Sequence, residues 1–222
     1  MKKSTTMKKI TILFCFIALS INAQDLDLKT QQKAIIPDNQ IKINLETGVE
    51  NQELQNYFDF ENISQFNFEV NGLLVKNKAY VLKLKEFEKG NLINTYTLFD
   101  ERKNKYFKTD STSMSFKIFT KIDQESLKIW IRGKSFGSKK SYFKLQEENI
   151  SKYVVKDFIG GRNPLIKDIS KPFYLLAAIT PYITKSGDGQ YCKVAYSDIN
   201  PENFGKEFGI PHYFLVEMEF IE

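Results

Sequence analysis

Residues 126–146 gather basic side chains around the single tryptophan of the chain. The segment contains no acidic residue and six basic ones: Lys128, Arg132, Lys134, Lys139, Lys140 and Lys144. Such a concentration of positive charge is typical of a surface that binds an acidic glycan, a lipid head group or an acidic protein. Residues 198–222 have the opposite bias, with six acids and one lysine. Alternatively, the two segments neutralise each other, or the lysines solvate an edge strand.

The pairing of two strands around this segment follows from their apolar residues. The residues that should share one buried face are Ile118, Thr120, Ile122, Leu127, Ile129 and Ile131. Pairing Ile122 with Leu127 achieves this, and it sets Phe119 opposite Trp130 on the other face. The same register frames the two rings with four cations: Lys117 opposite Arg132, and Lys121 opposite Lys128.

We therefore expect a ligand-binding surface that stacks a sugar ring or clamps an anion. It would consist of Phe119, Trp130, Lys117, Lys121, Lys128 and Arg132. The competing interpretation is that a second sheet or a loop covers this face and that the cations extend around a buried Trp130.

The other residues that could take part in catalysis have simpler structural interpretations. No Gly-x-Ser-x-Gly motif accompanies His212, the single histidine, so we interpret it as a residue at the start of a strand after Pro211. Cys192 alternates with Val194 and Tyr196, which predicts a small buried side chain. A Cys192–His212 nucleophile pair would depend on the fold bringing the two together.

Oxygen ligands and carboxylate pairs are also weak signals here. Asp157, Asp168 and Asp188 would serve a glycosidase only at a suitable separation, and Asp188 between two glycines is typical of a turn. Asn200 and Glu202 fit the start of a helix better than a calcium site. With one histidine and few cysteines, a His/Cys metal cluster is excluded, and we expect no metal and no cofactor.

The first residues have the pattern of a secretory signal peptide. Four lysines precede an apolar stretch at residues 10–21, which is too short for a bilayer that needs roughly 20 residues. We predict cleavage after Ala23, so residues 1–23 would be the leader. Cys15 lies inside the apolar stretch, which argues against lipidation. The Lys-, Asn- and Ile-rich usage and the Asn-Ala-Gln junction resemble exported proteins of Bacteroidetes-type bacteria, which implies export to the periplasm, cell surface or medium.

Without this leader, 28 basic residues face 27 acidic ones. A nearly neutral chain argues against nucleic acid as a partner, and we expect no transmembrane segment. Cys192 alone remains, so the mature chain can form no internal disulfide. We expect a polar N-terminal tether at residues 24–40 and one antiparallel β domain at residues 41–222.

Alternation of apolar and polar residues with period two dominates from residue 66 onward. It predicts strands near residues 66–70, 80–84, 92–99, 114–122, 127–131, 142–145, 153–155, 190–197 and 212–221. Residues 173–183 are ambiguous and are interpreted as a strand. Short helices are expected at residues 51–60 and after Asn200, ending at Gly209. The fold class is therefore mainly β, an antiparallel sandwich or barrel of about ten short strands with one or two minor helices.

Three functions are compatible with this fold. We expect an exported binding or interaction module for a glycan, an anionic ligand or an acidic protein surface. The first alternative is a glycan-directed hydrolase that uses carboxylates, which would need two of them facing across an open cleft. The second is a lipocalin-like carrier, which would need a barrel closed around an apolar cavity.

Overall fold

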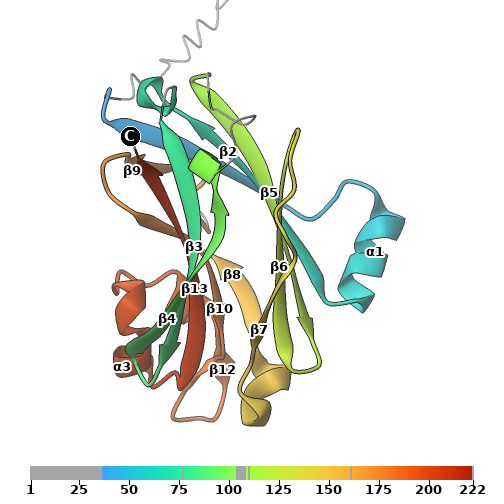
Figure 1. The fold of residues 1–222 in the computed structure, drawn as a ribbon. Coiled ribbons are helices and arrows are strands. Elements are labelled where there is room, and N and C mark those ends of the chain that lie inside the picture. Colours follow the sequence, from blue (N-terminus) through green and yellow to red (C-terminus); the bar gives the residue numbers. More distant parts are fainter. Residues whose placement is uncertain (1–36, 77, 104–108, 110, 161, 222) are drawn as a thin grey trace, which may run out of the picture. The chain divides into compact units, whose positions relative to one another are not determined.

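The computed structural model describes residues 37–221, apart from 77, 104–108, 110 and 161. The predicted leader at residues 1–23 and most of the tether at residues 24–40 lie outside the described residues. The described part of the chain contains thirteen antiparallel strands in three sheets, none of which closes into a barrel. The prediction of a mainly β, antiparallel fold is confirmed, in the sandwich form (Figure 1).

The first sheet has six strands in the order β7-β6-β5-β2-β1-β9. Their bounds are β1 Gln40–Thr47, β2 Ile63–Asn71, β5 Ser113–Asp123, β6 Ser126–Gly133, β7 Ser141–Lys144 and β9 Leu165–Asp168. We call this sheet A. Its strands alternate buried and exposed side chains, as expected of a sheet with only one face on a core.

The second sheet, sheet B, has five strands in the order β4-β3-β13-β10-β8. Their bounds are β3 Ala79–Glu88, β4 Asn91–Asp100, β8 Val154–Asp157, β10 Phe173–Ile179 and β13 His212–Ile221. A separate hairpin pairs β11 (Tyr182–Ile183) with β12 (Gly189–Gln190). Residues 173–183 are thus extended, as predicted, but they contribute to two strands.

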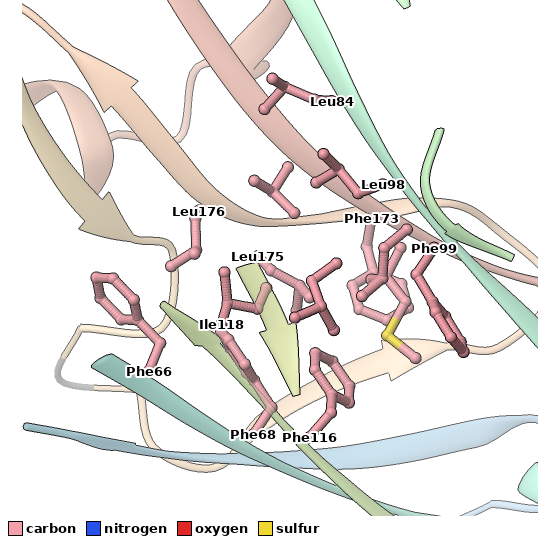
Figure 2. Close-up of a cluster of buried hydrophobic side chains, with 14 of the residues drawn as sticks. Phe66, Phe68, Leu84, Leu98, Phe99, Phe116, Ile118, Phe173, Leu175 and Leu176 are labelled. Atoms are coloured by element: carbon pink, nitrogen blue, oxygen red, sulfur yellow. The ribbon is translucent and has the colours of Figure 1, made fainter. Parts of the chain in front are cut away.

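The main core lies between the two sheets. Figure 2 shows its centre, where Phe66, Phe68 and Phe116 of sheet A meet Leu84, Leu175 and Leu176 of sheet B. Phe68 and Phe116 stack with ring centroids 5.4 Å apart. At about 25 cal/mol per Å² of apolar surface removed from water, such packing provides most of the driving force for the fold.

A second core covers the opposite face of sheet B. Two short helices, α2 (Cys192–Ala195) and α3 (Phe204–Phe208), lie over this face beside β13 and β10 (Figure 1). Val194 and Phe204 of the helices pack with Ala177, Tyr213 and Leu215 of the strands. The central strands β10 and β13 of sheet B are therefore buried on both faces, which explains their nearly continuous apolar sequences.

This helical layer corrects one prediction. Residues 190–197 were expected to form a strand, but only Gln190 lies in one, and Cys192–Ala195 form α2. Four residues cannot distinguish the two periods, and the fold places Val194 and Ala195 inward while Cys192 is exposed. The predicted burial of Cys192 is therefore wrong.

The remaining helices agree with the capping signals. α1 (Gln52–Phe60) begins after Asn51, whose side chain accepts a hydrogen bond from the backbone N–H of Leu54 at 2.9 Å. Asn200 caps a 3₁₀ turn in the same way, and α3 ends at Gly209 in the left-handed conformation. Further 3₁₀ turns are Leu73–Val75, Glu101–Lys103, Glu147–Lys152 and Pro201–Asn203.

Two strands of sheet A were not predicted. β1 has the expected alternation, with Ile41, Ile43 and Leu45 buried, and it begins at Gln40, the last residue assigned to the tether. β9 is a four-residue edge strand that pairs with β1, and a segment this short carries little periodic signal.

Candidate functional site

The pairing of β5 with β6 agrees with the predicted register. Ile122 lies opposite Leu127, Phe119 opposite Trp130, Lys117 opposite Arg132, and Lys121 opposite Lys128. The rings of Phe119 and Trp130 are 5.3 Å apart between centroids and tilted by 32°. Both side chains are half-buried and lie on the face of sheet A that is turned away from the main core. The fold thus brings the six candidate residues onto one surface.

The segment after β6 fixes the orientation of the indole. The Trp130 Nε1–H donates to the carbonyl oxygen of Ser138 at 3.1 Å, and the Ser138 hydroxyl accepts from the backbone N–H of Ile131. A Cβ at Gly137 would lie 3.2 Å from the guanidinium of Arg132 and 3.4 Å from Nε1 of Trp130, so the backbone here runs close to both side chains. The edge of the indole is covered while the residue remains partly open to solvent.

Helix α1 supplies a third ring that sequence reasoning did not assign to the site. Phe58 lines a surface hollow of about 260 Å³ together with Ile63, Phe119 and Trp130. Thr120, Lys121, Lys128 and Lys140 complete its lining. We call this the Trp130 hollow. Helical spacing of apolar residues in 51–60 was recognised, but which surface the helix covers is a property of the fold.

The cations around the hollow differ in their partners. Lys121 forms ion pairs with Glu61 at 2.7 Å and with Asp123 at 3.6 Å, so its charge is largely balanced. Arg132 and Lys140 lie over the Trp130 ring, 5.9 and 5.6 Å from its centroid. Lys128 lies over the exposed ring of Tyr142.

Four cations near the rings therefore lack a balancing carboxylate. Lys117, Lys128, Arg132 and Lys140 form no ion pair with any other residue that the structure describes. Lys140 was not among the predicted site residues. Its place over the indole follows from the course of the chain after Gly133, which no periodic pattern encodes.

The acidic segment at residues 198–222 pairs elsewhere. Glu202 and Glu217 bind Lys85 at 3.0 and 2.6 Å, and Glu219 binds Lys83. These lysines belong to β3 in sheet B. The interpretation in which residues 198–222 neutralise residues 126–146 therefore does not hold for these three acids.

His212 has partners that the sequence did not reveal. Its Nδ1 lies 2.7 Å from the hydroxyl of Tyr153, and its Nε2 lies 3.0 Å from a carboxylate oxygen of Glu86. Burial raises the pKa of Tyr153 to about 12. The histidine and Tyr153 are both buried at one end of the main core, where they satisfy each other's polar atoms.

The candidate carboxylates bind to their own turns. Asp157 accepts from the backbone N–H groups of Ile159 and Gly160, and Asp168 accepts from the backbone and hydroxyl of Ser170. Asp188 lies in the turn between β11 and β12, as predicted. Each carboxylate thus shapes a loop.

Three further features of the described residues concern cysteine, metal and membrane sites. There Cys192 is exposed, while both ring nitrogens of buried His212 are engaged by Tyr153 and Glu86. In that part of the chain no group of three or more His, Cys, Asp or Glu side chains is arranged to hold a metal. None of its helices has the length and apolar character needed to cross a bilayer.

Comparisons with other proteins identify no relative. No family model, curated protein or solved structure matches this chain.

Proposed function

We propose that this chain is an exported binding module that holds a ring of an acidic glycan in the Trp130 hollow. The observation that carries the proposal is the combination of three aromatic rings with cations that lack carboxylate partners. Phe58, Phe119 and Trp130 offer apolar surface to the C–H face of a sugar, while Arg132 and Lys140 lie over the indole. Lys128 also lines the hollow.

The size of the hollow suits contact with one small part of a long ligand. Its volume of about 260 Å³ is below the ~300–1,000 Å³ of most small-molecule sites. One sugar ring fits such a space, and the rest of a polymer would follow the outer face of sheet A. Carboxylate or sulfate groups on neighbouring sugars would then meet Lys117 and Arg132, which lie opposite each other on β5 and β6.

The two alternatives have less support. A carboxylate hydrolase would use acids such as Asp157 and Asp168, but these accept hydrogen bonds from the backbone of their own turns. A carrier would need room between the sheets, and large side chains such as Phe68 and Phe116 fill that region (Figure 2).

The test uses the fluorescence of Trp130, the single tryptophan of the chain. The mature protein is titrated with polygalacturonate, with neutral dextran as the uncharged control. We expect the acidic polymer alone to change the intensity and position of the emission, and the effect to weaken as salt is added. Emission that responds to neither polymer, together with no binding by calorimetry, would contradict the proposal.

Matched variants separate the hollow from general positive charge. We expect Lys128→Gln combined with Lys140→Gln to weaken binding at least tenfold. The control combines Lys76→Gln with Lys185→Gln, since both lysines are exposed and distant in sequence from the hollow. Equal losses in the two double variants would mean that net charge, not the hollow, causes binding. Phe58→Ala should reduce binding without changing the charge at all.

A further inference from the structure

A second pocket lies between the edge of sheet A and the start of β10. Its volume is about 470 Å³, and none of its lining residues belongs to the Trp130 hollow. The loop after β8, strand β9, the start of β10 and residues 197–201 form its walls. This volume falls within the ~300–1,000 Å³ typical of small-molecule sites.

Two cations in this pocket have no carboxylate to balance them. Arg162 and the half-buried Lys167 both line it, and neither forms an ion pair with a residue that the structure describes. Burial lowers the pKa of the Lys167 ammonium, and the positive charge of Arg162 lowers it further. Arg162 is exposed, so the cost of the two like charges falls mainly on the half-buried Lys167, and an anion in the pocket would compensate it.

The other charged groups of the pocket leave this imbalance in place. Lys171 adds a third cation, and Asp168 and Asp198 are the acids. Asp168 already accepts hydrogen bonds from the backbone N–H and the hydroxyl of Ser170, at 2.9 and 2.7 Å. With three cations and two acids in its lining, the pocket keeps an excess of one positive charge.

The loop that carries Arg162 is held in place on both sides. Asn163 exchanges two hydrogen bonds with the backbone of Leu45 in β1, accepting at 3.2 Å and donating at 2.9 Å. Asp157 fixes the start of the loop through Ile159 and Gly160. One Arg162 amino group donates to the carbonyl oxygen of Phe158 at 3.2 Å. A positioned guanidinium binds an anion with less loss of entropy than a freely moving one.

Part of the remaining wall is apolar, beside the polar residues Ser197, Asp198 and Asn200. Phe158, Phe173 and Tyr174 line the pocket, and the hydroxyl of Tyr174 is engaged with Lys85 and Glu202. Tyr174 thus contributes mainly ring surface. An apolar wall beside two cations suits a molecule with a ring or short chain at one end and an anionic group at the other.

We infer that this pocket binds a small organic oxyanion, with its carboxylate, sulfate or phosphate group between Arg162 and Lys167 and its apolar body against Phe158 and Phe173. Arg162 would offer paired N–H donors to two oxygens, and Lys167 a point charge to the third or to the same pair. The inference does not depend on the Trp130 hollow.

The test titrates the mature protein with phenyl phosphate and follows its melting temperature and calorimetric heat. Inorganic phosphate lacks the ring, and phenol lacks the charge. We expect phenyl phosphate to raise the melting temperature, inorganic phosphate to bind at least tenfold more weakly, and phenol to have no effect. Equal binding of both phosphates would contradict the role of the apolar wall.

Variants distinguish a binding site from a structural one. Lys167→Met should lose binding at least tenfold, yet melt at the same or a higher temperature than the parent in the absence of ligand, because an unbalanced charge is removed. If Lys167 were structural, its replacement would instead lower the melting temperature. Arg162→Gln should also lose binding, whereas the Lys128→Gln/Lys140→Gln protein should retain it. Unchanged affinity in both Arg162→Gln and Lys167→Met would overturn the inference.

An independent measurement follows the lysine itself. With ¹³C-labelled lysine side chains, the Lys167 signal should titrate below the ordinary value of 10.5 in the free protein. Saturation with phenyl phosphate should raise that pKa, since a bound anion favours the charged ammonium. A Lys167 signal that does not respond to phenyl phosphate would contradict the site.

Discussion

The indole nitrogen of Trp130 donates a hydrogen bond to the carbonyl oxygen of Ser138, eight residues further along the chain, at 3.1 Å. This bond ties the segment after β6 back onto its own strand, where Gly137 pairs with Arg132. One edge of the ring is therefore part of the fold, and its remaining surface lines the hollow with Phe119.

This double role sets the expected stability of a Trp130→Ala variant. Loss of the hydrogen bond costs about 0.5–1.5 kcal/mol, and loss of the ring pair about 0.5–1.5 kcal/mol. We expect these two losses, about 1–3 kcal/mol together, plus the lost apolar burial of a half-buried ring, in urea denaturation. Phe116→Ala is the control, because this core ring should cost about 3–5 kcal/mol. A loss at Trp130 as large as that at Phe116 would identify Trp130 as a core residue.

The candidate surface on β5 and β6 could be predicted because alternation fixes register. A shift of one residue would have put Ile118 and Ile131 on opposite faces, so the pattern excluded it, and the short turn between Ile122 and Leu127 fits the observed pairing. The contributions of Phe58 and Lys140 could not be predicted this way. They depend on where helix α1 and the segment after Gly133 lie in space.

Within sheet B, only the segment of β10 was ambiguous, for the opposite reason; the strands predicted at residues 80–84, 92–99, 153–155 and 212–221 are present as β3, β4, β8 and β13. Where both faces of a strand are buried, as in β10, alternation disappears and helix and strand look alike. The polar partners of His212 could not be predicted either, since Glu86 and Tyr153 are far from it in sequence.

The predicted leader gives a direct chemical test. We expect the exported protein to begin at Gln24, because the apolar stretch ends at Ala23 and polar residues follow at once. Mass spectrometry of the secreted or periplasmic protein measures this end. A product that retains Cys15 with an attached lipid would contradict the prediction.

Cys192 should react quickly with thiol reagents in the native protein. It is exposed at the start of α2, so access does not require unfolding. We expect labelling by a maleimide at a rate close to that of the urea-unfolded chain. Cys192→Ser should change stability by less than about 0.5 kcal/mol, as at other exposed positions. Slow labelling would mean that this region is covered in solution.

Glu86 should contribute to stability in a pH-dependent way. Burial by itself would raise its pKa, but hydrogen bonds from His212, Asn94 and Tyr96 outweigh it and hold the pKa below the ordinary 4.5. A lowered pKa in the folded state stabilises the protein above that value, and this stability is lost as acid protonates the carboxylate.

The Glu86→Gln variant tests this directly. We expect it to melt below the parent at neutral pH, with the gap narrowing as the pH falls below about 4.5 towards the pKa of the folded state. Melting curves at several pH values measure the gap. A gap that stays constant down to strongly acidic pH would show that the amide disturbs packing instead.

An ion cluster beside sheet B joins one lysine to three polar partners. The Lys85 ammonium binds Glu217, Glu202 and the hydroxyl of Tyr174. Burial alone would lower the pKa of Lys85, but these hydrogen bonds outweigh it and raise the pKa above its ordinary value.

Replacement of Lys85 by methionine should therefore destabilise the protein far more than the same change at Lys83. The side chain of Glu217 is only 6% exposed, so Lys85→Met leaves a buried carboxylate without its cation. Breaking such a pair costs about 3–5 kcal/mol. Lys83 and its partner Glu219 are each about 30% exposed, and an ion pair of this kind contributes at most about 1 kcal/mol. Urea denaturation at neutral pH measures the loss of unfolding free energy in each variant, and both lysines lie on the same strand. Similar losses would mean that water reaches Glu217 as easily as Glu219.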